Sequence, residues 1–227
     1  MKIKQLSLLV VFCIGFVTVC FSQHRRYRIQ NNVGIMGGLT QYDIITDNFE
    51  TKKGTGWMLG ASATVDLPNK WYNLSYMIQL TQNPFEIETR TTGASTETTL
   101  TEYKVFTVQA GLIGHLKLVG NNITIDAGPM LQYNSNLELQ DGSHENYFIQ
   151  NYTNLQAKDI EDVSNFNVNG MVGATAGFDH FKVSAHYVYS FLNTLEKLND
   201  QNLDTTGGES NFKGNQSMLI FGVAVFF

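Results

Sequence analysis

A long alternation of apolar and polar residues constrains this chain more than any other feature. The segment GWMLGASATVDL places Trp57, Leu59, Ala61, Ala63, Val65 and Leu67 on one face and Met58, Gly60, Ser62, Thr64 and Asp66 on the other. Because successive side chains of a strand point to opposite faces, the segment predicts one long strand with two unlike faces. After a short turn at 68–70 the alternation resumes from Tyr72 to Leu80, which predicts an antiparallel hairpin.

The same pattern returns along the rest of the chain. Apolar alternate positions run from Phe106 to Leu118 and from Ile123 to Tyr133, and again from Phe166 to Phe178 and from Phe181 to Phe191. An opening strand near 32–42 and a closing strand ending at Phe227 bring the predicted number to eight. Short turns fall near 68–70, 119–122 and 179–180, and long polar loops near 43–55, 83–101, 135–164 and 193–215. Short turns at one end and long loops at the other are typical of an all-β, eight-stranded antiparallel transmembrane barrel, an up-and-down meander with periplasmic turns and extracellular loops.

Some positions within this pattern carry expectations of their own. Pro129 offers no ladder donor inside its strand, which predicts a local bulge. Leu192, Leu195 and Leu198 have helical spacing, which indicates a short helical turn in the last loop. The inward face of the closing strand would consist of Ile220, Gly222, Ala224 and Phe226, and it is more apolar than the other inward faces.

The amino terminus has the order of an export signal. Lys2 and Lys4 precede a mostly apolar run from Leu6 to Phe21, and cleavage after Ser22 divides the chain into a signal peptide, 1–22, and a barrel domain, 23–227. Acylation of Cys20 and an uncleaved anchor are the alternatives. Cys13 and Cys20 are the two cysteines, so the predicted mature chain lacks disulfides and thiolate ligands.

Strand length and face chemistry favour a membrane over a soluble secreted binding barrel. A tilted strand needs about 9 to 11 residues to cross a bilayer, and these segments supply them, whereas strands of soluble proteins run to about 5 or 6 residues. Aromatic residues near the strand ends are predicted to form two interfacial girdles: Trp57, Tyr72, Tyr133, Phe178, Phe181, Tyr189, Phe191 and Phe227. The predicted location is the outer membrane, in contact with outer-membrane lipid.

The export signal, the hairpin rhythm and the terminal Phe227 resemble the small bacterial outer-membrane β-barrel proteins of the PorT-like family. This resemblance covers essentially the whole mature chain, and its sharpest motif is the aromatic-ended last strand. It implies that Phe221, Val223, Val225 and Phe227 form an assembly signal that the barrel-assembly machinery reads during insertion. Some relatives serve a secretion and gliding apparatus, so the resemblance also implies a membrane protein complex as a partner.

Ionisable residues on the inward faces form the candidate site: Asp66, His115, Lys117, Asp126, Lys182 and His186. In a narrow lumen such groups should pair, because an unpaired buried charge is costly. A charged plug is the favoured interpretation, with an ion path or a general acid/base pair of His115 or His186 with Asp126 or Asp66 as the alternative. His186 is expected nearer mid-barrel than the others. No nucleophile motif is visible, so we expect no enzyme, no catalytic residues, no metal and no cofactor.

The long loops are acidic and the predicted mature start is basic. In loop 135–164, acidic residues outnumber Lys158: Glu138, Asp141, Glu145, Asp159, Glu161 and Asp162. His144 is expected to be solvated in this loop, and Arg25, Arg26 and Arg28 to face anionic lipid or a periplasmic partner. Export and net acidity exclude nucleic acid. The predicted function is a non-enzymatic structural or interaction component of the cell surface, and a narrow channel for small solutes is the alternative.

Overall fold

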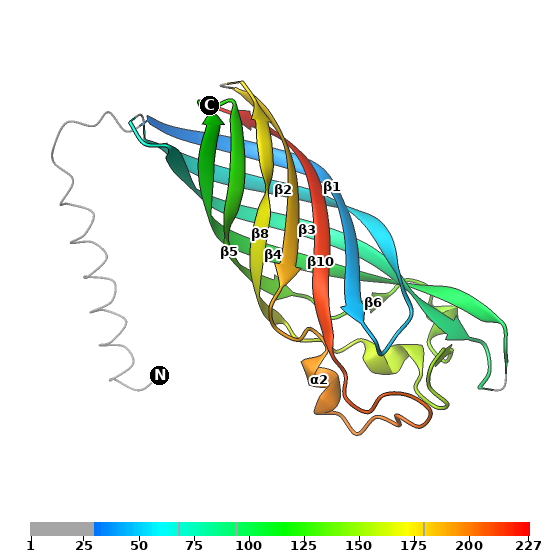
Figure 1. Cartoon of the computed structure of the whole chain (residues 1–227). Helices are drawn as coiled ribbons and strands as arrows, with labels where there is room; N and C mark the ends of the chain where they lie inside the picture. The colour runs from blue at the N-terminus through cyan, green and yellow to red at the C-terminus, as the bar shows by residue number, and fades with distance from the viewer. Residues whose placement is uncertain (1–29, 68, 94, 179) are drawn as a thin grey trace, which may run out of the picture.

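Eight long strands form the wall of the molecule in the computed structural model, which describes residues 30–67, 69–93, 95–178 and 180–227. They are β1 (Gln30–Thr46), β2 (Thr51–Asp66), β3 (Tyr72–Arg90), β4 (Thr98–Val119), β5 (Ile123–Asn134), β8 (Phe166–Gly177), β9 (Phe181–Ser190) and β10 (Gly214–Phe226). Each strand pairs antiparallel with the next, and β10 pairs with β1, so the sheet closes into a ring (Figure 1). The predicted eight-stranded antiparallel meander is confirmed. The predicted signal segment lies outside the described residues.

Short elements lie at the loop end, opposite the carboxyl terminus (Figure 1). β6 (Glu138–Leu139) pairs with β4 and β7 (Phe148–Ile149) pairs with β3. The short helices are the 3₁₀-helices η1 (Gly142–His144) and η2 (Ala157–Ile160) and the α-helix α2 (Glu196–Asn199). The predicted helical turn is α2, which buries Leu195 and Leu198, while Leu192 stays exposed. None of the described helices is long and apolar enough to cross a membrane.

The predicted loops 43–55 and 83–101 are too long. Strand β1 continues to Thr46 and β2 starts at Thr51, while β3 continues to Arg90 and β4 starts at Thr98. On β3 the period-two alternation continues to Arg90 with the chemistry of the two faces exchanged, whereas the pairing of β2 with β3 shifts register between Lys53 and Trp57. Phe85 and Ile87 are buried inside the ring. Glu86 and Glu88 flank Ile87 on this strand, so the polarity of the segment predicts a loop.

The bulge predicted at Pro129 is also wrong. The pairs Gly111–Met130 and Gly114–Ala127 on either side of Pro129 share one register, and the ladder between β4 and β5 merely loses the intervening pairs. Pro129 removes a donor without adding a residue, so no side chain changes face. The register shift of this hairpin lies between Lys117 and Val119.

Two regions follow from the polarity of the inward face. We call the short-turn region, where large apolar side chains point outward, the barrel section. We call the loop-end region, where apolar side chains point inward, the cap. The buried apolar side chains of the cap come from the strand ends and from the β1–β2, β5–β8 and β9–β10 loops: Tyr42, Ile44, Phe49, Phe85, Ile87, Tyr103, Val105, Leu137, Ile149, Tyr152, Leu155, Ile160, Val163, Leu195, Leu198 and Phe212.

Side chains fill the lumen of the barrel section in three layers: a polar network nearest the short turns, a layer of methionines, and a layer of amides nearest the cap. Their order follows the sequence of inward residues along each strand. On β3 the inward series is Ser75, Met77 and Gln79, and on β5 it is Asp126, Met130 and Gln132. The middle, methionine layer takes every methionine after Met1, together with Ile113 and Ile220: Met36, Met58, Met77, Met130, Met171 and Met218. Unbranched methionine adapts to irregular gaps, which suits a narrow ring of unequal neighbours.

The apolar inward face of β10 has a place in this arrangement. Ile220 is 1% exposed and belongs to the methionine layer. Gly222 leaves room for Ser184 and Met58, since a Cβ there would lie 3.0 Å from Ser184 Oγ. At the short-turn end the ring of Phe226 packs on Gly34, and Lys182 Nζ lies 5.2 Å from its centroid. The closing strand therefore contributes the middle and the mouth of the lumen.

Candidate functional site

Asp126 is the centre of the candidate site, at the short-turn end of the lumen. Its side chain is completely buried, and four donors converge on its two oxygens. His115 Nδ1 lies 2.7 Å and Thr124 Oγ1 2.7 Å from Oδ1. His186 Nε2 lies 2.9 Å from Oδ2, to which Thr175 also donates. Because a carboxylate only accepts, both imidazoles donate to it.

A glycine on the intervening strand makes this geometry possible. The register places Gly173 of β8 between Asp126 of β5 and His186 of β9. A Cβ on Gly173 would lie 2.6 Å from His186 Cδ2, so only glycine lets this imidazole cross β8 to the carboxylate. The expectation that His186 lies nearer mid-barrel than Asp126 is therefore wrong, because both side chains meet at one level.

Asp66 and Lys117 form the second part of the network, beside the short turns. Lys117 Nζ lies 2.9 Å from Asp66 Oδ1, and Asn121 Nδ2 donates to Asp66 Oδ2 at 2.8 Å. Asn73 links this pair to both turns, because its Nδ2 donates to Asn121 and its Oδ1 accepts from the backbone N–H of Leu67. Lys182 contributes at the mouth through the ring of Phe226. The structure thus brings all six predicted ionisable residues into the short-turn end of the lumen.

The chain Ser75, His115, Asp126 has the order of hydroxyl, imidazole and carboxylate that activates nucleophiles in enzymes. Ser75 Oγ lies 2.7 Å from His115 Nε2, but it is also 2.7 Å from Thr64 Oγ1. Ser75 is 2% exposed, and the adjoining cavity measures about 60 Å³, which holds a few water molecules. Every lone-pair direction of the carboxylate is occupied. The four donors thus satisfy the hydrogen bonding of the buried carboxylate inside the ring.

The described residues contain no group of three or more His, Cys, Asp or Glu side chains placed to hold a metal ion. The two imidazoles of the network share one carboxylate and use it as a hydrogen-bond acceptor.

The predicted interfacial aromatics all point outward, in two groups. Tyr72, Phe178, Phe181 and Phe227 lie toward the short-turn end, and Trp57, Tyr133, Tyr189 and Phe191 lie toward the loop end. Sequence reasoning missed Trp71, which is 69% exposed and packs edge-on against Tyr72. Its position in the turn next to Tyr72 was the available signal. Phe106 and Phe166 are also exposed and belong to the loop-end group.

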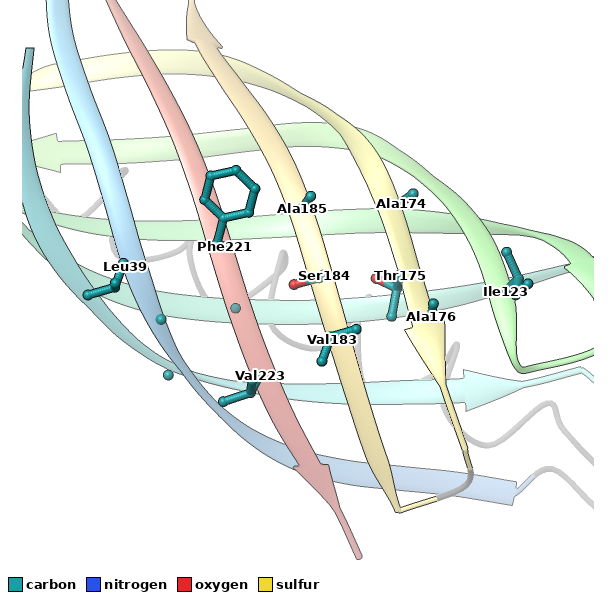
Figure 2. A pocket seen from close by; sticks show the side chains of 13 residues that line it. Leu39, Ile123, Ala174, Thr175, Ala176, Val183, Ser184, Ala185, Phe221 and Val223 are labelled. Atoms are coloured by element: carbon teal, nitrogen blue, oxygen red, sulfur yellow. The ribbon is translucent and has the colours of Figure 1, made fainter.

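The residues of the predicted assembly signal also face outward. Figure 2 shows Phe221 and Val223 on the outer surface of β10, beside Leu39 of β1 and Val183 of β9. Between these larger side chains and Ile123 the surface is hollowed over Gly37 and three alanines, Ala174, Ala176 and Ala185. This outer face is almost purely apolar.

The amide layer lies between the methionine layer and the cap. Gln79 donates to Gln109, Gln109 donates to Gln132, and Gln132 donates to Gln216. Asn134 and Asn169 extend the chain through Gln132. Alternation along the chain places these amides on the inward faces, but it does not show that they form one connected hydrogen-bond chain across the ring.

Loop 135–164 is folded onto the cap. His144 is not simply solvated, because its Nδ1 lies 3.1 Å from Thr101 Oγ1 and its ring stacks on Tyr147. Asp162 pairs with Lys197 at 2.9 Å, while burial and the neighbouring Glu145 raise the pKa of Glu161. The ion pair with Lys197 thus holds Asp162 at the cap surface.

Comparison with known proteins gives matches among solved structures alone, because no family model and no curated protein sequence matches. The crystal structure of Neisserial surface protein A matches with 12% identity and a TM-score of 0.46, over 87% of this chain and 97% of that chain. The crystal structure of Ail, the attachment invasion locus protein of Yersinia pestis, in complex with the heparin analogue sucrose octasulfate, matches with 13% identity and a TM-score of 0.47. This match covers 87% of this chain and 99% of that chain. The backbone structure of Ail in a phospholipid bilayer nanodisc matches with 12% identity and a TM-score of 0.41, over 87% of this chain and 100% of that chain.

Proposed function

We propose that this chain is an integral outer-membrane protein in which a closed barrel section anchors a folded cap, and that the cap is a non-enzymatic interaction surface outside the cell. The observation that carries the proposal is the reversal of polarity along one continuous wall. In the barrel section Leu39, Ile78 and Phe221 are each more than half exposed. A soluble barrel would turn such side chains inward, whereas hydrocarbon accommodates them outward.

The filled lumen favours an anchor over a channel. From the short turns upward, the ring contains the polar network, the methionine layer and the amide layer, and the cap core closes the loop end. The cavities within the lumen measure about 60 Å³ and about 10 Å³ at separate levels. An eight-stranded ring is just wide enough for its side chains, in agreement with this filling.

The folded loops support the role given to the cap. Phe49, Tyr152 and Phe212 of three different loops pack with ring centroids 5.9 to 6.2 Å apart. Asn48 adds hydrogen bonds to Asn211 and to Lys213. Ordered loops can present a fixed surface at a low entropic cost of binding. Since the surface is acidic, cationic groups are the partner chemistry that it favours.

Orientation and assembly complete the proposal. The termini lie on the periplasmic side, the aromatic groups mark the two interfaces with lipid, and the outward face of β10 is what the barrel-assembly machinery reads. Deletion of Phe227 is expected to lower the amount of inserted protein, and normal membrane levels would contradict the assembly role. The PorT-like resemblance extends the partners to a secretion or gliding complex, which a pull-down in mild detergent would test.

Two measurements test the anchor. Washing isolated membranes at high pH with carbonate should leave the protein in the pellet, and its release without detergent would exclude a membrane-spanning barrel. Purified protein in planar bilayers should give no steady single-channel conductance. A conductance that disappears when Lys182 or Asp126 is replaced would establish the channel alternative instead.

A further inference from the structure

Four buried polar atoms of the described lumen lack a hydrogen-bond partner within the protein. Ser62 Oγ adjoins the larger cavity beside the polar network, and the other three belong to residues that line one smaller cavity. These three are Tyr42 Oη, Asn169 Oδ1 and Gln216 Nε2. Their residues are 1%, 1% and 4% exposed. The cavity measures about 10 Å³ and lies where the amide layer meets the cap. Buried polar groups almost always have a partner, so this coincidence of three unpaired atoms requires an explanation.

The orientation of the two amides is fixed by the amide layer. Asn169 Nδ2 donates to Gln132 Oε1, and Gln216 Oε1 accepts from Gln132 Nε2. Exchanging nitrogen and oxygen in either amide would set two acceptors or two donors against each other. The free ends that remain are one acceptor on Asn169 and one donor on Gln216.

The other polar groups around the cavity are already occupied. Asn83 accepts from Thr40 and donates to Thr81, while Thr107 shares a hydrogen bond with Thr81. Ser190 Oγ accepts from the backbone N–H of Gln216 and donates to Leu192. None of these side chains has to turn toward the unpaired atoms.

We propose that this cavity is the site of one ordered water molecule that bridges Tyr42, Asn169 and Gln216. The cavity is at the size that one water requires, about 10–15 Å³, and it offers three polar partners. A water can donate to Asn169 Oδ1, accept from Gln216 Nε2 and bond to the hydroxyl of Tyr42. The donor on Gln216 disfavours a cation, and the acceptor on Asn169 disfavours an anion.

This water joins the two regions of the molecule. Tyr42 belongs to the cap core, where its ring packs edge-on against Phe85 at 5.7 Å between centroids. Asn169 and Gln216 belong to the barrel section, on β8 and β10. The site therefore completes the hydrogen bonding at the level where the polarity of the wall reverses, and it does not depend on the proposed function.

The sign of one substitution tests the water site. With the water present, Tyr42→Phe removes a hydrogen bond and should shift the midpoint of urea unfolding in lipid vesicles to lower urea. Without it, the variant merely removes an unsatisfied hydroxyl, and the midpoint should stay or rise. Tyr103→Phe is the matched control, because Tyr103 Oη donates directly to Ala157 O at 2.9 Å and its loss lowers the midpoint in either case. An unchanged or raised midpoint for Tyr42→Phe overturns the proposal.

A direct measurement keeps the proposal testable if either variant folds poorly. In wild-type protein, the side-chain amide protons of Gln216 should show magnetisation transfer to a long-lived water by NMR. Those of Gln109 should not, because Gln109 Nε2 donates to Gln132. Absence of the Gln216 signal under conditions that preserve the backbone spectrum overturns the water site.

Discussion

Strand β3 passes through two regions with opposite rules of burial. In the barrel section Tyr76 and Ile78 point outward and Ser75 points inward; in the cap Glu86 and Glu88 point outward and Phe85 points inward. The strand keeps one continuous alternation from end to end, with odd-numbered residues inward throughout. What changes is the medium outside the wall. Hydrocarbon around the barrel section and water around the cap account for both halves with the same backbone.

Charged side chains are buried in the barrel section and partly exposed in the cap. The largest expected loss of unfolding free energy follows from this difference. Asp126→Ala leaves two histidines and two threonines of the barrel section without their shared acceptor, and should cost about 3–5 kcal/mol of unfolding free energy. In the cap, Asp162→Ala removes a half-exposed pair with Lys197 and should cost about 0–1 kcal/mol. Urea unfolding in lipid vesicles measures both values. Equal losses would contradict a buried network in the barrel section.

For aromatic side chains, the larger loss of unfolding free energy is expected in the cap and the smaller one in the barrel section. Phe212 is 1% exposed in the cap core, so Phe212→Ala should cost about 3–5 kcal/mol through the cavity that it leaves. Phe221 points outward from the barrel section, where lipid can fill the space of a missing ring, so Phe221→Ala should cost less. The loss in Phe212→Ala should open the loops to limited proteolysis first, while the barrel section remains inserted. Simultaneous loss of both regions would show that the cap has no stability of its own.

A charge added to the outer surface tests whether hydrocarbon or water lies outside each region. Ala185 lies in the middle of β9 on the outer face, and Ala185→Arg should cost about 2–4 kcal/mol in a bilayer. Glu102 lies on the outer face of β4 in the cap, and Glu102→Arg should stay within about 0.5 kcal/mol. Folding into vesicles, followed by urea titration, gives the comparison. Tolerance of arginine at both positions would place water outside both regions.

The smallest effect concerns the acidic cap surface. Because burial and Glu145 raise the pKa of Glu161, folding favours its protonated form. That stabilisation is complete below the ordinary glutamate pKa and is lost as pH rises through the raised value. Glu161→Gln, which stays neutral, should therefore stabilise the cap slightly at pH 7 and match the wild type in acid. A difference that does not change with pH would assign the effect to packing.

The sequence predicted the barrel section well because alternation is local, and a run such as 56–67 states its two faces residue by residue. It failed at 83–101 because the alternation continues there with apolar residues inward and charged residues outward. The polarity of this segment indicates a loop, although the segment forms strands. The sequence named His186 with Asp126 as one of several possible pairs, but it could not show that both His115 and His186 meet Asp126 at one level. The meeting of His186 with Asp126 depends on strand register across β8 and on the missing side chain of Gly173, neither of which follows from spacing along the chain.

Cysteine scanning along β3 would test the reversal of polarity most directly, since residues 23–227 contain no cysteine. Single cysteines from Tyr72 to Arg90 would carry a fluorescent label, read in vesicles with lipid-soluble and water-soluble quenchers. We expect even-numbered positions up to Leu80 to respond to the lipid-soluble quencher, and Glu86 and Glu88 to the water-soluble one. Odd-numbered positions should be protected from both. Lipid quenching at odd-numbered positions, or the same medium outside Ile78 and Glu88, would contradict a single wall that passes from hydrocarbon to water.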